Sequence, residues 1–229
     1  MLTVADKITL ARVALAPIAV AGYLLAPSEH FLCFWICGWI CAIAELTDWL
    51  DGMVARARHE VSDFGKLADP FCDVLYRMSV FLAFLLPAGG VGYQLAQGAL
   101  PAWTAFLLPH TFVVGHGADG AVLVGTACVP WLPVFLMAMR EIVAGAIRAM
   151  AATKGLVLAA RTSGKVKAIL QCCTIIAISA LPGLTFTWNP WFLVVTGVLV
   201  WICAIASIGS IIEYIWINRE VLRGLGAKR

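Results

Sequence analysis

Charge is the scarcest feature of this sequence. Asp, Glu, Lys and Arg together make up 13% of its 229 residues, whereas hydrophobic residues make up 62%. The mean hydropathy is +0.93. One soluble core could not hide this much apolar surface, so a lipid bilayer is its natural surrounding. We expect an integral membrane protein with no nucleic-acid partner.

Basic residues are missing from three long stretches, namely residues 13–55, 78–139 and 168–218. Cytoplasmic loops of membrane proteins carry an excess of Lys and Arg, so each barren stretch should leave the cytoplasm and return to it. Three such excursions predict an all-α, polytopic fold with six transmembrane helices and both termini in the cytoplasm. We treat residues 1–229 as a single domain.

The apolar runs set the expected helix boundaries, because a spanning helix needs about 20 mostly apolar residues. The expected helices cover residues 8–26, 31–56, 65–86, 129–152, 165–181 and 191–218. Residues 88–127 are apolar but are broken by many glycines and prolines. We expect an unusually long outer loop there, which could include a short interfacial or re-entrant helix over residues 102–114. Two further spans are the alternative.

The chain has eight cysteines, a number that by itself would suggest a set of disulfides. Six of them lie inside apolar runs, at positions 33, 37, 41, 172, 173 and 203. Buried thiols behave as small hydrophobic side chains. We expect reduced cysteines that serve packing.

Four of the few acids gather at the ends of apolar runs. Asp48 and Asp51 are three residues apart, and Asp69 and Asp73 are four apart, so each pair shares one face of a helix. A short connection between the two helices would let all four carboxylates converge. Hard oxygen ligands of this kind suit Mg²⁺, Mn²⁺ or Ca²⁺ rather than zinc.

Small residues accompany these acids. Gly52 and Ala55 would leave one helix face bare enough for a ligand to approach the backbone. Arg56 could then hold a phosphate that the metals also bind. The structural alternative is that the acids only form ion pairs with Arg56, Arg58 and Lys66 while the small residues pack helices.

Residues 48–73 follow the pattern D-x2-D-G-x2-A-R-x8-G-x3-D-x3-D at every fixed position. This pattern resembles the signature of the CDP-alcohol phosphotransferase family. The resemblance implies a six-helix membrane enzyme, usually a homodimer, that uses two divalent ions, Mg²⁺ or Mn²⁺. Such an enzyme binds the diphosphate of a CDP-linked lipid, transfers the phosphatidyl or an equivalent group to an alcohol, and releases CMP.

The resemblance also implies roles for individual residues. The metal ligands would be Asp48, Asp51, Asp69 and Asp73. The CDP-lipid site would comprise Asp48, Asp51, Gly52, Ala55, Arg56 and Gly65. Asp73 would also be the catalytic base for the acceptor hydroxyl.

A second group of cations follows later in the chain, at Arg140, Arg148, Lys165 and Lys167. Uncompensated charge within a membrane helix is costly, so Arg140 and Arg148 call for an anionic partner. A phosphorylated acceptor would supply one. Orientation of the chain by positive charge is the simpler alternative.

Several segments resemble the phosphatidylglycerophosphate synthase branch of the family. They include Thr9 to Arg12, Phe64 to Pro70 and the Arg-Glu-Ile run that begins at Arg140. On this resemblance the donor is CDP-diacylglycerol, the acceptor is sn-glycerol 3-phosphate and the product is phosphatidylglycerol phosphate. Two positions depart from the branch. Val74 replaces its usual Lys, and Glu45 adds an acid that could support the metal site or join two helices.

Two other functions remain as alternatives. A sister transferase would use inositol phosphate, serine or phosphatidylglycerol as its acceptor. A divalent-cation transporter would also carry membrane acids, but it would place them near the bilayer midplane along a continuous path. We expect a bacterial inner-membrane location with the active site facing the cytoplasm.

Overall fold

Six helices account for most of the chain that the computed structural model describes. The described residues are 4–26, 32–58, 63–86, 111–116, 122–153, 162–185 and 190–219. The helices are α1 (Val4–Leu25), α2 (Leu32–Arg58), α3 (Asp63–Ala83), α4 (Trp131–Thr153), α5 (Thr162–Thr185) and α6 (Pro190–Ile217).

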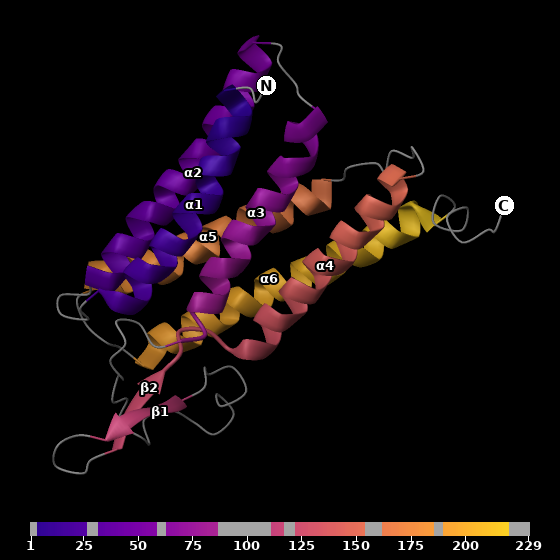
Figure 1. Cartoon of the computed structure of the whole chain (residues 1–229). Coiled ribbons are helices and arrows are strands. Elements are labelled where there is room, and N and C mark those ends of the chain that lie inside the picture. The colour runs from indigo at the N-terminus through magenta and orange to yellow at the C-terminus, as the bar shows by residue number, and fades with distance from the viewer. Residues whose placement is uncertain are drawn as a thin grey trace.

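The helices run back and forth between two ends of one bundle (Figure 1). At one end, α1 begins, α2 ends and α3 begins, and we call this the signature end. The most extensive packing joins α1 to both α2 and α3, while α5 packs against α6 and α2, and α4 packs against α6. In Figure 1 the ends of α2, α4 and α6 all lie on the side of the bundle away from the start of α6.

The six predicted helices are present with small shifts at their ends. The largest shifts are at the start of α1, which begins at Val4 instead of residue 8, and at the end of α5. Helix α5 continues to Thr185 although Pro182 and Gly183 predict an end near residue 181. Proline lacks one N–H group and so removes one backbone hydrogen bond, which weakens a helix without forcing it to stop at that residue.

A small antiparallel hairpin interrupts the helical pattern. It consists of β1 (Thr111–His116) and β2 (Val122–Thr126), with Thr111 opposite Thr126 and a bulge after Val113. Figure 1 shows it at the end of the bundle opposite the signature end. Within the described residues it is the departure from an all-α fold.

The helix expected over residues 102–114 is wrong at residues 111–114, which belong to β1, and residues 102–110 lie outside the described residues. The alternative of two further helical spans is likewise wrong at the residues that form β1 and β2. Both strands are rich in Val and Thr, which favour extended backbone over helix.

Aromatic contacts fix the bundle near the hairpin. The ring of Tyr23 in α1 meets Phe34 in α2 and Phe84 just after α3, at centroid distances of 5.6 and 5.2 Å with edge-on geometry. The Tyr23 hydroxyl donates a hydrogen bond to the carbonyl of Leu86 and lies 3.0 Å from Cys128 Sγ. The first three helices are thus joined to the segment that precedes α4.

Cys128 ties that segment to two further elements. Its backbone N–H donates to the Phe84 carbonyl at 2.9 Å, and its own carbonyl accepts a 2.7 Å hydrogen bond from Thr196 Oγ1 in α6. Burial raises the pKa of the Cys128 thiol to about 12, so the thiol stays protonated at neutral pH.

The cysteines are reduced as predicted, but the packing role is not confirmed for all of them, because Cys173 is exposed and Cys172 is only partly buried. All eight are free, and Cys33, Cys37 and Cys41 form a buried row along one face of α2. Four-residue spacing places them one helical turn apart, where their small apolar side chains fill the interior.

Among the described residues, two segments have the length and hydropathy of a membrane span, Thr162–Leu181 and Phe192–Ile217. Their mean hydropathies are 1.5 and 2.4. Two shorter apolar segments, Thr9–Leu25 and Leu32–Thr47, lie in α1 and α2. The predicted number of spans and the cytoplasmic termini stay predictions.

Gly22 lets α1 approach α2 closely. A Cβ at this position would lie 2.5 Å from Ile36 Cγ2, well inside van der Waals contact. Gly22→Ala should therefore destabilise the bundle by about 1–3 kcal/mol through overpacking. Thermal unfolding of detergent-solubilised protein, followed by tryptophan fluorescence, measures the change.

Gly145→Ala is the matched control, because a Cβ on Gly145 of α4 would meet no heavy atom within 4 Å. Alanine also favours helix over glycine. Equal midpoints for the two variants would contradict the close approach of α1 and α2.

Candidate active site

The signature acids lie on two helices. Asp48 and Asp51 belong to the second half of α2, while Asp69 and Asp73 belong to α3. The helical spacing predicted for each pair is therefore present in the backbone. For seven of the predicted site residues the structure describes the backbone alone. They are Asp48, Asp51, Gly52, Ala55, Arg56, Gly65 and Asp69.

Asp73 is the signature acid whose side chain is described. Its Oδ1 pairs with the Arg12 guanidinium from α1, and its Oδ2 lies 3.6 Å from Nη1 of Arg77, one turn further along α3. Arg12 is 1% exposed and Asp73 is 22% exposed. Both carboxylate oxygens thus face cations, and one edge of the group remains accessible.

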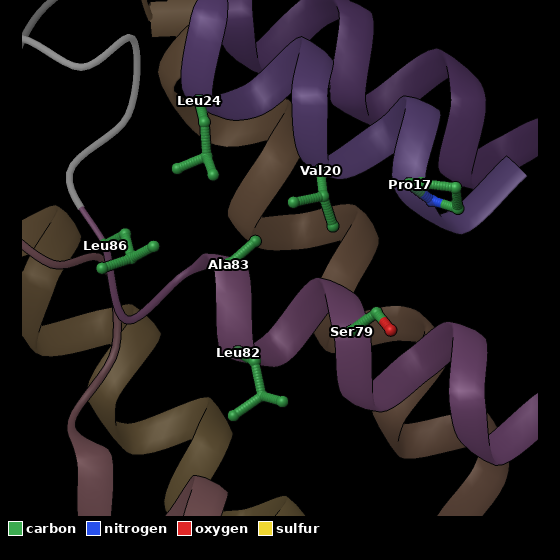
Figure 2. Close-up of a pocket in the computed structure, with 7 residues that line it drawn as sticks. All are labelled: Pro17, Val20, Leu24, Ser79, Leu82, Ala83 and Leu86. Atoms are coloured by element: carbon green, nitrogen blue, oxygen red, sulfur yellow. The ribbon is translucent and has the colours of Figure 1, made fainter.

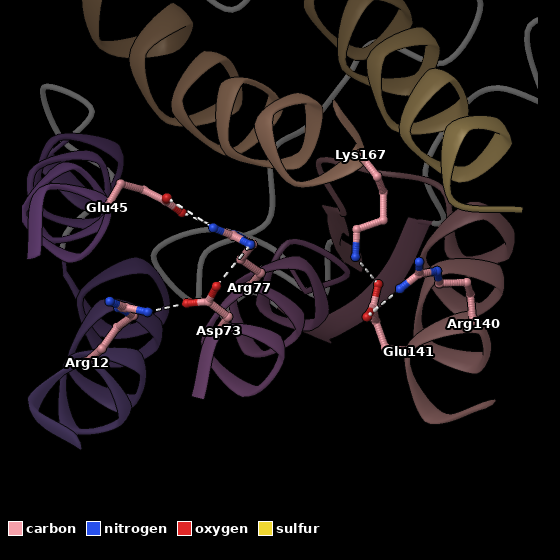
Figure 3. Close-up of polar contacts among 7 residues, drawn as sticks. All are labelled: Arg12, Glu45, Asp73, Arg77, Arg140, Glu141 and Lys167. Atoms are coloured by element: carbon pink, nitrogen blue, oxygen red, sulfur yellow. Dashed lines mark hydrogen bonds and ion pairs between the residues drawn. The ribbon is translucent and has the colours of Figure 1, made fainter. Parts of the chain in front are cut away.

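Glu45 continues this chain of charges. Arg77 Nε donates to Glu45 Oε1 at 3.3 Å, and Arg77 Nη2 donates to Glu45 Oε2 at 3.3 Å. We refer to Arg12, Asp73, Arg77 and Glu45 as the ion-pair network, which Figure 3 shows spanning three helices. Its two acids and two cations balance, as largely buried charges must.

Sequence reasoning missed the roles of Arg12 and Arg77. Arg77 could have been found, because its spacing of four residues from Asp73 puts both on one helix face. Arg12 is 61 residues from Asp73, and its pairing depends on how α1 packs against α3. Glu45 joins two helices, because it contacts Arg77 of α3 from α2. Arg77 in turn lies within ion-pair distance of the signature acid Asp73.

The predicted acceptor-binding cations separate into two groups. Arg140 and Lys167 both pair with Glu141, which is 3% exposed. Arg140 also donates to Ser210 Oγ of α6 from Nε and Nη2, at 3.2 and 2.8 Å. Glu141 therefore links α4 to α5 (Figure 3), and Arg140 links α4 to α6 through Ser210.

Arg148 and Lys165 are exposed. Arg148 Nε donates to the carbonyl of Ala144 in its own helix at 3.2 Å. Within the described residues, neither cation forms an ion pair with Glu141. The structure therefore leaves these two more accessible to an anionic ligand than Arg140 and Lys167.

The two charged clusters lie on helices that pack together, since α3 contacts both α4 and α5. Figure 3 shows the network on α1, α2 and α3 beside the Glu141 cluster on α4 and α5. The site thus brings acids suited to a cation close to cations suited to a phosphate.

An apolar groove of about 410 Å³ lies between α1 and α3 (Figure 2). Its lining residues are Pro17, Val20, Leu24, Ser79, Leu82, Ala83 and Leu86. Only Ser79 among them has a polar side chain, so the groove offers no set of ligands for a metal or a diphosphate. The polar chemistry belongs to the charged clusters.

The donor set fits a divalent cation. Four carboxylates on two helices are hard oxygen ligands of the kind that Mg²⁺ and Mn²⁺ prefer. Among the described side chains, no group of three or more His, Cys, Asp or Glu residues forms a metal site, and three of the four signature acids fall outside that set. Asp73 is held in place at mid-helix by two cations.

Residues 2–209 match the model of the CDP-alcohol phosphatidyltransferase family. The chain belongs to this family, a family of transferases, and the resemblance predicted from the signature is confirmed.

Two bacterial relatives match along nearly their whole length. A Bacillus subtilis protein named CDP-diacylglycerol–glycerol-3-phosphate 3-phosphatidyltransferase is 30% identical over 97% of this chain and 98% of its own. A Haemophilus influenzae protein of the same name is 29% identical over 94% of this chain and 92% of its own. A Mycobacterium tuberculosis protein, provisionally named cardiolipin synthase, is 31% identical over 57% of this chain and 52% of its own.

Glu141 should be essential to the stability of its cluster. Glu141→Gln would leave Arg140 and Lys167 without their common counter-charge, and breaking a buried ion pair costs about 3–5 kcal/mol. We expect a large fall in the thermal unfolding midpoint.

The double variant Glu141→Gln/Lys167→Met should recover much of that loss, because it also removes one stranded cation. A double variant as unstable as the single one would contradict the pairing. Glu213→Gln, on a partly exposed acid of α6, is the control and should have little effect.

Proposed function

We propose that this protein transfers the phosphatidyl group of CDP-diacylglycerol to sn-glycerol 3-phosphate, giving phosphatidylglycerol phosphate and CMP. The observation that carries the proposal is the complete signature over residues 48–73, in a chain that matches two relatives named for this reaction along almost all of its length.

A membrane location follows from the composition and from the two apolar helices. We propose six spans with the signature end in the cytoplasm, because the basic clusters lie at the helix ends that gather there. For a bacterial protein this is the inner membrane. Homodimer assembly remains a prediction that rests on the family resemblance.

Asp48, Asp51, Asp69 and Asp73 would hold two divalent ions, Mg²⁺ or Mn²⁺. When bound, such ions neutralise the diphosphate and stabilise the leaving CMP oxygen in an in-line displacement at phosphorus. Arg56 would bind a phosphate oxygen. Gly52, Ala55 and Gly65 would allow the nucleotide to approach the helix backbone.

Asp73 would receive the proton of the acceptor hydroxyl. The acceptor oxygen then forms its bond to the phosphorus that carries the diacylglycerol, and the bond from that phosphorus to CMP breaks. Arg12 pairs with the Asp73 carboxylate and would hold it in position, so it need not reorganise during the reaction.

The acceptor phosphate would bind near Arg140, Arg148, Lys165 and Lys167. Arg148 and Lys165 are the exposed members of this set, so they can contact the phosphate directly. Arg140 and Lys167 are bound to Glu141 and would act mainly through their charge.

A second acceptor has one observation in its favour. The partial similarity to the provisionally named cardiolipin synthase suits phosphatidylglycerol as the acceptor, with the same donor chemistry. The membership of a transferase family argues against the divalent-cation transporter.

The deciding assay measures CMP release from CDP-diacylglycerol by the purified protein with Mg²⁺ or Mn²⁺. We expect release with sn-glycerol 3-phosphate and background release with serine, inositol phosphate or phosphatidylglycerol. Asp69→Asn should insert normally and reduce release to background, because it removes a metal ligand. Release that depends on phosphatidylglycerol instead would support the second acceptor, and full activity in Asp69→Asn would refute the metal assignment.

Arg148→Ala tests the acceptor site. Hydrogen bonds to charged groups contribute about 1.5–3 kcal/mol, so the KM for sn-glycerol 3-phosphate should rise about tenfold or more. The KM for CDP-diacylglycerol should change little. Arg148→Lys, which keeps the charge, should recover part of the loss, whereas equal effects on both substrates would count against this role.

A further inference from the structure

Glu45 and Arg77 form a two-point contact next to a proposed metal ligand. The two hydrogen bonds from Arg77 to the Glu45 carboxylate are equal in length, at 3.3 Å, and use both carboxylate oxygens. Such paired contacts fix the plane of a guanidinium better than a single contact does. Glu45 is 16% exposed and Arg77 is 9% exposed, so water competes little for either.

The third nitrogen of Arg77 faces Asp73 without bonding to it. Its Nη1 lies 3.6 Å from Asp73 Oδ2, which is within ion-pair range but beyond a hydrogen bond. Of these two carboxylates, Glu45 therefore holds Arg77 more closely than Asp73 does. The other oxygen of Asp73 pairs with Arg12.

This division matters because an arginine and a divalent ion compete for the same carboxylate oxygens. An Arg77 that closed fully onto Asp73 would occupy Oδ2 with a hydrogen bond and add positive charge where the metal must bind. Its two bonds to Glu45 oppose that movement. Resting on the function proposed above, we propose that Glu45 is a positioning residue that holds Arg77 back and keeps Asp73 Oδ2 accessible to a divalent ion.

A purely structural pair would behave differently. If the contact only fastened α2 to α3, loss of either partner would lower stability, and loss of both would not restore metal binding. If Glu45 restrains Arg77, loss of Glu45 should weaken metal binding, and loss of Arg77 in addition should restore it. The two roles therefore predict opposite results for the double variant.

The test is a Mn²⁺ titration of the full-length protein in lipid nanodiscs, without CDP-lipid, in which the electron paramagnetic resonance signal reports free Mn²⁺. Glu45→Gln should raise the Kd for Mn²⁺ about tenfold, as for other residues that support metal ligands. Glu45→Gln/Arg77→Gln should return to within about twofold of the wild type, since Arg77 is then gone. Glu213→Gln is the charge-matched control and should bind Mn²⁺ as the wild type does.

Each outcome has a defined meaning. An unchanged Kd in Glu45→Gln, or a double variant that binds as weakly as the single one, would overturn the proposal while leaving the proposed function intact. A wild type that binds no Mn²⁺ would also overturn the proposal, whereas the proposed function is decided separately by the CMP-release assay. Glu45→Asp serves where Glu45→Gln does not fold, because it keeps the charge but shortens the reach. It should show a smaller rise in Kd, and no rise would also overturn the proposal.

Discussion

The structure depends on the pairing of a few charges inside an apolar bundle. Ionised side chains in such surroundings are costly unless an opposite charge lies close by. Arg12, Asp73, Arg77 and Glu45 meet this requirement with contacts that run from α1 through α3 to α2. The same contacts that neutralise these groups also fix how the three helices are aligned. The position of Asp73 is therefore set by the packing of these helices.

The second half of the bundle also pairs its buried charges, but there the cations outnumber the acids. Glu141 is one acid shared by Arg140 and Lys167, and it joins α4 to α5. Across the two clusters, four cations face three acids, so the described part of the region favours anions. A diphosphate and a phosphorylated alcohol are both anionic. On the proposed function, the metal-bound donor would bind at the half formed by α1, α2 and α3, and the acceptor phosphate at the half formed by α4 and α5.

The sequence predicts what is periodic and local in this protein. The acid pairs of the signature are helical because spacings of three and four residues share a helix face, and the row of packing cysteines in α2 follows the same rule. The hairpin was not predicted, because its Val- and Thr-rich strands are short and the glycines and prolines around them indicate an irregular loop. The pairing of Arg12 with Asp73 depends on tertiary packing across 61 residues. Periodicity places cations on a face, but it does not say that Glu141 would engage two of them.

The ion-pair network also separates folding from metal binding. A carboxylate left bare in apolar surroundings would make the folded state depend on its metal, as in small metal-folded domains. Arg12 and Arg77 already neutralise Asp73, so this region folds around arginines. On the proposed metal assignment, binding of a divalent ion at Asp73 would exchange one cation for another and would create no new order. An enzyme built in this way would lose and regain its ions without unfolding. This requires arginines that lie close enough to balance the charge of Asp73 but far enough away to leave a carboxylate oxygen to the ion.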